Sequence, residues 1–265
     1  MTIELLTNNA NNLRKQTEKD LFILNLKSGL VRAMKGLDYY RVIEYAISYL
    51  LLNLKKGDRV LDIGSLDSIF PIYLSVKGYE IYAIDINIKV GGLKKLARTF
   101  GLNNFCSLVS DATKMPFPNN FFDKITAISS VEHILPVEIG DFKAFREIAR
   151  VLKVGGNAII TVPYKNEVSQ KWRYHPTHGR YLIRWYNKKY LTRIAKTAGL
   201  SSEILFFCDD VGFARIWYNF LEIFLSPISI FFGHVFLRLR TIPFQAKGAI
   251  IVLRKDKVFD YHEKG

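Results

Sequence analysis

The stretch that decides the fold begins Arg59-Val-Leu-Asp62-Ile-Gly64-Ser-Leu-Asp-Ser-Ile-Phe-Pro71 and ends Gly78-Tyr-Glu-Ile-Tyr-Ala-Ile-Asp85. It predicts an apolar strand, a sharp turn at Gly64, a short helix and a second strand that closes on a carboxylate. This is one βαβ unit with an acid about 20 residues beyond the turn, a layout that places a nucleoside at the carboxyl ends of parallel strands. Because a carboxylate can accept from both hydroxyls of a ribose, the pattern predicts a nucleoside cofactor.

The turn itself contains only one of the three glycines of a dinucleotide fingerprint. Leu66 and Ser68 stand where further glycines would let the backbone approach a pyrophosphate. The loop therefore suits a cofactor without phosphate better than a diphosphate. Asp67 or Ser68 is expected to cap the following helix, with Pro71 in its first turn. An ordinary βαβ unit without a ligand remains the alternative.

The chain continues as alternating strands and helices. Two further strands are predicted to end in polar residues, Phe105 to Asp111-Ala112 and Phe122 to Glu132-His133. Helical periodicity runs from 142 to 152, ends at Gly155-Gly156, and is followed by a fifth strand over 157–163. An earlier apolar stripe over 40–54 predicts a helix before the sheet. This alternation predicts a mostly parallel sheet covered on both faces.

Taken together, several segments resemble the class I S-adenosylmethionine-dependent methyltransferases, particularly their small-molecule (type 11-like) branch. The resemblance covers residues 38–205 and 246–254 and is carried by Val60-Leu-Asp62-Ile-Gly64, Asp85, Asp111-Ala112, Met115 to Asp123, Val131-Glu-His133 and Arg150 to Gly156. It implies an α/β fold, Rossmann-like and doubly wound, with a mostly parallel seven-stranded sheet. N-terminal helices and a helical insertion before the last strand complete the expected fold.

The same resemblance implies how S-adenosyl-L-methionine is held. Asp62 and Gly64 would border its methionine part, Asp85 would hold the ribose, and Asp111 would accept from the adenine amine with Ala112 packing nearby. The set of expected cofactor contacts is completed by Ser65, Ile86 and Ser129. The family usually has glycines where Leu66 and Ser68 stand, so a degenerate, non-catalytic binding module remains an alternative. In the family the helix before the sheet lies over the cofactor cleft, which makes Tyr39, Tyr40 and Arg41 candidates to line it.

The chemistry implied is an in-line displacement that depends mainly on alignment. For a hydroxyl acceptor a base is needed, and His133 is the candidate because it follows the fourth strand at the mouth of the cleft. Glu132 is expected to orient it or the acceptor, although a structural role for His133 stays open. The Glu-His pair also resembles part of a metal site in ubiquinone-biosynthesis O-methyltransferases. Ser129 replaces the further acid of that site, so no metal is predicted.

Length and composition favour one intracellular domain. The 265 residues are divided into an N-terminal helical cap (1–56), a cofactor-binding core (57–164), substrate-side additions (165–245) and a closing strand with tail (246–265). Cys106 and Cys208 lie in apolar runs without metal spacing, so both are predicted to be buried thiols in a reducing compartment. The N-terminus lacks the pattern of a signal peptide, which favours a cytoplasmic protein.

The first substrate-side addition is basic and aromatic. Residues 165–196 hold nine Lys and Arg against the single acid Glu167, and six Trp and Tyr are interleaved. This mixture suits phosphates and rings, so it favours an anionic small substrate, an anionic membrane surface or a nucleic acid. A solvated basic face, as on the helix expected over 188–198, is the plainer interpretation. His175 and His178 lack further ligands for a zinc site.

The second addition is an apolar run over 216–237, with 15 uncharged residues between Glu222 and Arg238. It is too short to span a bilayer and is interrupted by Pro227 and Gly233. We expect a lid, an interfacial segment of a peripheral membrane protein or an oligomer contact. Both additions are predicted to face the same side as one acceptor platform.

These features predict S-adenosylmethionine-dependent methyl transfer, to an oxygen of a small anionic or lipid-linked acceptor of glycan or isoprenoid type. Amino methylation of bases is disfavoured because Ser129-Ser-Val-Glu-His replaces the required motif, and neither cysteine has the context for cytosine methylation. Methylation of RNA or another nucleic acid therefore rests on the basic aromatic segment alone. A nicotinamide-dependent oxidoreductase is disfavoured by the missing glycines.

Overall fold

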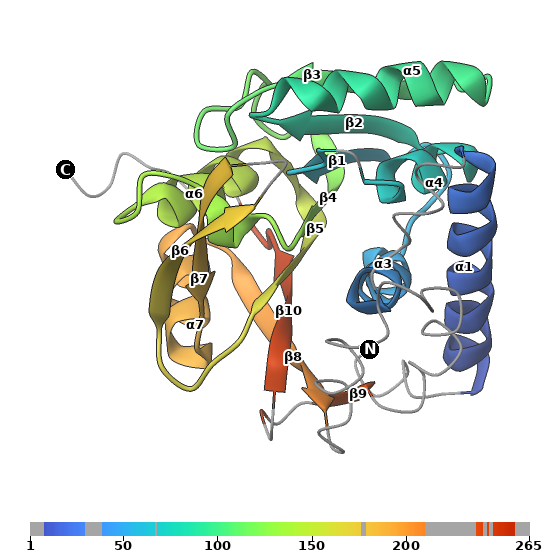
Figure 1. Cartoon of the computed structure of the whole chain (residues 1–265). Coiled ribbons are helices and arrows are strands. Elements are labelled where there is room, and N and C mark those ends of the chain that lie inside the picture. Colours follow the sequence, from blue (N-terminus) through green and yellow to red (C-terminus); the bar gives the residue numbers. More distant parts are fainter. Residues whose placement is uncertain are drawn as a thin grey trace.

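The computed structural model describes residues 8–29, 39–66, 68–175, 179–209, 237–240, 243 and 246–257. Its centre is a twisted eight-stranded sheet (Figure 1). The parallel part contains β3 (Phe105–Val109), β2 (Glu80–Asp85), β1 (Arg59–Ile63), β4 (Phe122–Ile128) and β5 (Leu152–Pro163). The antiparallel part contains β10 (Ala246–Arg254), β8 (Ser201–Asp209) and β9 (Leu237–Arg240). The strand order is β3-β2-β1-β4-β5-β10-β8-β9.

Helices cover both faces of the sheet, because successive strand residues point to opposite sides. Leu61 of β1 and Ile160 of β5 contribute to the core under α6 (Gly140–Val151) and α7 (Lys188–Thr197). Val60 and Ile159, their chain neighbours, contribute to the opposite core. That core lies under α1 (Asn8–Lys27), α3 (Tyr39–Leu52), α4 (Phe70–Val76) and α5 (Gly91–Thr99). Two 3-10 turns, η2 (Ile88–Val90) and η3 (Val131–His133), follow β2 and β4.

This architecture confirms the predicted fold class, including the N-terminal helices and the mostly parallel Rossmann-like sheet. The short strand β9 adds an eighth strand at the antiparallel edge. Most of the predicted helical insertion and of the apolar run at 216–237 lies outside the described residues. One of the two segments expected to form an acceptor platform is thus not described, so their facing the same side stays a prediction.

The basic aromatic segment folds mainly as a hairpin. It contains β6 (Ser169–His175) and β7 (Gly179–Trp185), which pair antiparallel in a separate two-stranded sheet (Figure 1). The inner strand β7 lies against η3 and β5. The helix expected over 188–198 is α7, with Leu191, Ile194 and Ala195 buried. The hairpin was not predicted because cations and rings alternate on an exposed outer strand, which hides the apolar period of two.

The predicted cap of the helix after β1 needs correction. The N-cap position of α4 is Ile69, which makes no side-chain cap, and Ser68 instead accepts from the amide of Phe70 at 3.2 Å.

Two further sequence expectations need correction. The helix α6 ends at Val151, so Gly155 and Gly156 do not end it but lie inside β5, where a register shift relative to β4 accommodates three extra residues between Leu152 and Asn157. Cys106 is exposed on the edge strand β3, because that strand has a neighbour on one side only. The side chain of Cys208 lies outside the described part of the structure.

Candidate functional site

The turn after β1 is built around a tightly packed glycine. Gly64 has φ +76°, and a Cβ on it would lie 2.2 Å from Cβ of Ser130. The amides of Gly64 and Ser65 both donate to the carbonyl oxygen of Ile84, at 2.8 and 3.0 Å. The chain thus bends sharply directly after β1, in the space between Ile84 of β2 and Ser130 after β4. Only glycine combines this φ with this close approach. Leu66 also has a positive φ, 40°.

Asp62 supports this turn from inside the protein. Its side chain is buried and accepts from Oγ of Ser65 at 2.7 Å and from Oγ1 of Thr126 at 2.6 Å. Ser65 is itself 1% exposed. Burial raises the pKa of Asp62 to about 6, although the two hydroxyl donors oppose the shift. Asp62 and Ser65 were both predicted to contact a cofactor, but in the structure their side chains form hydrogen bonds that hold the turn.

Two carboxylates follow neighbouring strands at the same edge of the sheet. Asp85 closes β2 half-buried and accepts from the amide of Leu66 at 3.0 Å and from that of Asn87 at 2.7 Å. Asp111 follows β3, is exposed, and accepts from the amide and hydroxyl of Thr113. The residue that follows each carboxylate differs in burial: Ile86, after Asp85, is 74% exposed, whereas Ala112, after Asp111, packs on the core.

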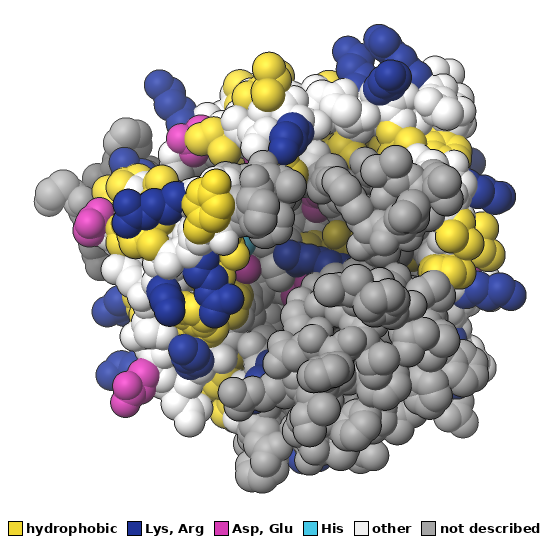
Figure 2. Space-filling model, in the orientation of Figure 1, with side chains coloured by type: hydrophobic (Ala, Val, Ile, Leu, Met, Phe, Trp, Pro, Cys, Tyr) yellow, Lys and Arg dark blue, Asp and Glu magenta, His cyan; other side chains and the backbone are white. Residues whose placement is uncertain are grey.

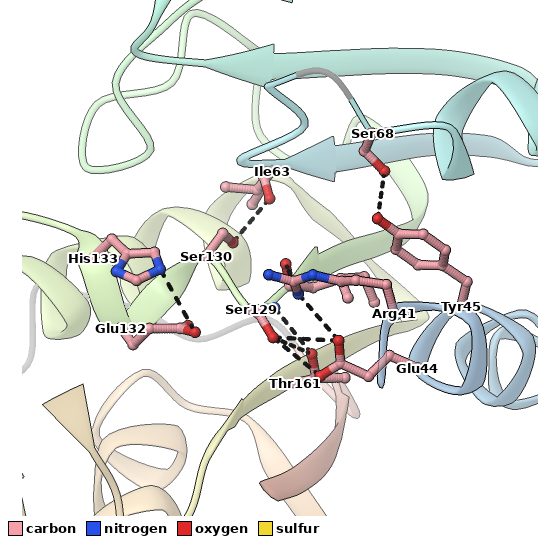
Figure 3. Close-up of polar contacts among 11 residues, drawn as sticks. Arg41, Glu44, Tyr45, Ile63, Ser68, Ser129, Ser130, Glu132, His133 and Thr161 are labelled. Carbon is pink, nitrogen blue, oxygen red and sulfur yellow. Dashed lines mark hydrogen bonds and ion pairs between the residues drawn. The ribbon is translucent and has the colours of Figure 1, made fainter. Parts of the chain in front are cut away.

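Ser129 occupies a strained position directly after β4, with φ +43°. Its amide donates to Oγ1 of Thr161 at 2.9 Å, and its hydroxyl donates to Oε1 of Glu44 at 3.0 Å. Figure 3 shows these groups meeting beside the first turns of α3, at the carboxyl ends of β4 and β5. The strain is held by partners from two other elements, one of them 85 residues away in the chain.

Arg41 and Tyr45 of α3 face the same region. Nη1 of Arg41 donates to Oε2 of Glu44 at 3.0 Å, and the guanidinium points toward the segment after β4 (Figure 3). The hydroxyl of Ser68 donates to that of Tyr45 at 2.9 Å, which ties the turn to α3. Sequence reasoning placed Arg41 at the cleft but missed Glu44, whose signal is a carboxylate within an otherwise apolar helix stripe. The side chains of Tyr39 and Tyr40 lie outside the described residues.

Glu132 and His133 follow in η3 and differ sharply in environment. Glu132 is 2% exposed, and its Oε2 has no hydrogen-bond partner among the described residues. Burial raises the pKa of this carboxyl, while the neighbouring His133 opposes the shift. The side chain of His133 is 37% exposed, and its Nε2 lies 3.8 Å from Oε1 of Glu132. Nδ1 of His133 hydrogen-bonds the carbonyl oxygen of Leu182 in β7.

Since a carbonyl only accepts, the contact with Leu182 assigns the donor role to Nδ1 of His133. In the neutral ring Nε2 is then the acceptor, on the partly exposed side. The arrangement thus combines a nitrogen able to take a proton, a buried carboxyl beside it and a guanidinium from α3. The carboxylates of Asp85 and Asp111 stand at the carboxyl ends of β2 and β3, strands farther along the same sheet.

The described residues contain no group of three or more His, Cys, Asp or Glu side chains placed to hold a metal ion. Within the same part of the chain, no helix is both long and apolar enough to cross a membrane.

Comparison with known families identifies the chain. The sequence model described as "Methyltransferase domain" matches residues 37–203. A stretch of 117 residues is 35% identical to the ubiquinone/menaquinone biosynthesis C-methyltransferase UbiE of Azotobacter vinelandii, covering 42% of this chain and 44% of that protein. The UbiE of Yersinia pestis is 33% identical over 112 residues, or 40% and 43% of the two chains. The chain thus spans less than half the length of these curated relatives.

Solved structures share the fold at low identity. An S-adenosylmethionine-dependent methyltransferase of Methanosarcina mazei aligns with TM-score 0.56 at 18% identity, covering 76% of this chain and 94% of that one. The 1,6-didemethyltoxoflavin-N1-methyltransferase of Burkholderia thailandensis aligns with TM-score 0.53 at 15% identity, covering 81% and 77%. The [4+2]-cyclase SpnF aligns with TM-score 0.55 at 21% identity over 80% of each chain. At these identities the likeness shows the fold and leaves the reaction to the site.

Proposed function

We propose that this chain, which belongs to the class I S-adenosylmethionine-dependent methyltransferases, methylates an oxygen of a small anionic or lipid-linked acceptor. The chain is an enzyme of this family, which uses S-adenosyl-L-methionine. The cofactor, when bound, supplies an electrophilic methyl group on a sulfonium. What remains to be assigned is the acceptor and the role of each residue.

The donor set at the edge of the sheet supports cofactor binding. Asp85 is half-buried, and it is our candidate acceptor for the ribose hydroxyls. Asp111 is the candidate acceptor for the adenine amine, with Ile86 and Ala112 as apolar neighbours of the base. The turn offers a single glycine, which suits a nucleoside that carries no diphosphate.

The remaining predicted cofactor residues are proposed to act indirectly. Gly64 lets the turn pass close to Ser130, while Asp62 and Ser65 hold each other and Thr126. Ser129 keeps its strained backbone through Glu44 and presents the end of β4 to the cleft. We therefore assign these side chains to shaping the pocket for the methionine part of the cofactor.

For the acceptor we propose that His133 is the general base. Its contact with the Leu182 carbonyl is the observation that carries the proposal, because it leaves Nε2 ready to accept the proton of an acceptor hydroxyl. Oε1 of Glu132, at 3.8 Å from Nε2, is placed to stabilise the imidazolium that forms. Alignment of acceptor and methyl group supplies the rest of the acceleration.

Labelled cofactor tests this proposal when methylation in cell extract is partitioned into lipid, nucleic-acid and water-soluble fractions. We expect label in the lipid or water-soluble fraction, as a methoxy group. His133→Ala should retain cofactor affinity in calorimetry and lose turnover by about 10²–10⁴-fold. Unchanged turnover would return His133 to a structural role, and label confined to nucleic acid would overturn the acceptor class.

Methyl transfer to a carbon atom is the second candidate, favoured by the name of the curated relatives, which are C-methyltransferases. The same base would serve, because a carbon acceptor must also lose a proton. Nuclear magnetic resonance of the isolated product separates a methoxy from a C-methyl group.

The proposal also covers domain organisation and location. We propose a single-domain protein of the cytoplasm that binds peripherally to the membrane, and the net charge of +14 supports contact with an anionic surface.

A further inference from the structure

We infer that the outer strand of the β6–β7 hairpin and the cations beside it form a docking surface for an anionic lipid bilayer. The inference deepens the proposed function and rests on it only for the reason why a membrane-borne acceptor would be delivered here. We call this the hairpin surface and define it by Lys165, Lys171, Trp172, Arg173, Tyr174 and Arg180.

The outer strand is exposed on both of its faces. Residues 171–174 are all exposed, although successive side chains point to opposite sides of a strand. Two of them are large aromatics, Trp172 at 39% and Tyr174 at 76% exposure. Exposed rings of this size, side by side on one edge strand, call for a partner that accommodates rings.

The inner strand, in contrast, is anchored in the protein. Leu182 and Arg184 of β7 are 1% and 3% exposed. The guanidinium of Arg184 donates to the carbonyl oxygens of Ile134 at 2.9 Å, Pro136 at 3.1 Å and Val137 at 2.7 Å. The hairpin is therefore a fixed projection, and the exposure of its outer strand is a stable property of the fold.

Cations and rings are interleaved on this surface. Arg180 lies 4.6 Å from the centre of the Trp172 ring, and Lys165 lies 4.1 Å from that of Trp185. In sequence, Glu167 is the only acid between residues 165 and 185, against four exposed cations. Figure 2 shows Lys and Arg side chains beside hydrophobic ones over this region. An anionic bilayer accommodates such a surface, because the rings can lie at the depth of the headgroups while the cations contact the phosphates.

The hairpin surface also adjoins the proposed base. The ring of Tyr181 stands 5.5 Å from that of His133, edge to face, and the next residue holds Nδ1 of His133. A bilayer seated on the hairpin would thus lie beside the acceptor side of the site. An acceptor with an apolar tail could reach Nε2 of His133 without leaving the membrane surface entirely.

Vesicle flotation tests the inference with the full chain. Vesicles of phosphatidylcholine alone are compared with vesicles containing phosphatidylglycerol, at low and high salt. We expect binding to the anionic vesicles, weakened by salt. The double variant Arg173→Glu and Arg180→Glu should weaken it by roughly tenfold or more. The matched control Lys94→Glu and Lys95→Glu, with the same charge change on exposed positions of α5, should weaken it much less.

A second arm isolates the rings. Tyr174→Ala should lower binding that persists at high salt, whereas Ile88→Ala, which removes an 80% exposed apolar side chain elsewhere, should not. Equal losses in the two charge variants would overturn the hairpin as the docking surface. The inference would also be overturned if the protein bound no vesicle of any composition, or if it bound RNA oligonucleotides and not vesicles. Flotation needs no methyl transfer, so failure of the proposed function and failure of this inference are told apart.

Discussion

Nδ1 of His133 hydrogen-bonds the main-chain carbonyl of Leu182, and the two residues are 49 positions apart in the chain. The contact joins the segment after β4 to the hairpin that follows β5. It selects the nitrogen that stays available for chemistry, and it does so with a backbone atom whose identity no substitution at 182 changes. The position of the hairpin, and not its side chain at 182, therefore sets the state of the proposed base.

The first prediction concerns Arg184, which holds the hairpin in place. Arg184→Gln removes donors to three carbonyl oxygens in the loop after His133. We expect the free energy of unfolding to fall by about 2–3 kcal/mol, because three carbonyl oxygens lose the charged donors of a buried guanidinium. Urea denaturation measures it. The exposed Arg180→Gln is the control, and an equal loss there would contradict the anchoring role.

Cofactor affinity should depend on Asp85. Asp85→Asn keeps one of the two acceptor oxygens that serve the amides of Leu66 and Asn87 and removes the charge offered to a ribose. We therefore expect binding of S-adenosylmethionine to weaken by about 1.5–3 kcal/mol. Calorimetry measures the loss, and Asp256→Asn removes an exposed carboxylate elsewhere as the control. Equal affinity in the Asp85 variant and the unmodified protein would count against the assignment.

Asp62 should make stability depend on pH. Its pKa rises from 3.8 to about 6 on folding because burial penalises the charged form. The folded state therefore favours the protonated carboxyl, so this contribution is full below pH 4 and is lost as pH rises through about 6. Relative to Asp62→Asn, the unmodified protein should lose on the order of 3 kcal/mol of stability over that window. Denaturation at several pH values checks this, and parallel curves for both proteins would refute it.

Alanine substitutions at Gly64 and Gly101 should separate the cost of a steric clash from the cost of backbone strain. Both have positive φ, +76° and +67°, but only at Gly64 would a Cβ meet a neighbour, 2.2 Å away on Ser130. Gly101→Ala should cost about 1–2 kcal/mol, the usual penalty of that conformation. Gly64→Ala should cost at least about 2 kcal/mol more, since a backbone or strand must shift. Adding Ser130→Gly to Gly64→Ala should recover part of the loss in thermal unfolding.

Much of the fold followed from local patterns. The turn at Gly64, the carboxylates after two strands and the alternation of strands with helices are legible in sequence because each depends on residues a few positions apart. The hairpin was missed, since exposed cations and rings carry no apolar period. The exposure of Cys106 was missed too, because an apolar run does not say whether its strand lies at the edge of the sheet.

The amino-acid sequence by itself determined the βαβ framework, the family and the position of Asp85 and His133 at the ends of strands, because chain geometry alone delivers them there. Tertiary structure decided how the site is held: Glu44 on Ser129 across 85 residues and Arg184 on Ile134 across 50. The physical reason is that a buried carboxylate or guanidinium must find its partners wherever packing places them. Periodicity records which side chains are buried, but not which distant polar atoms they meet.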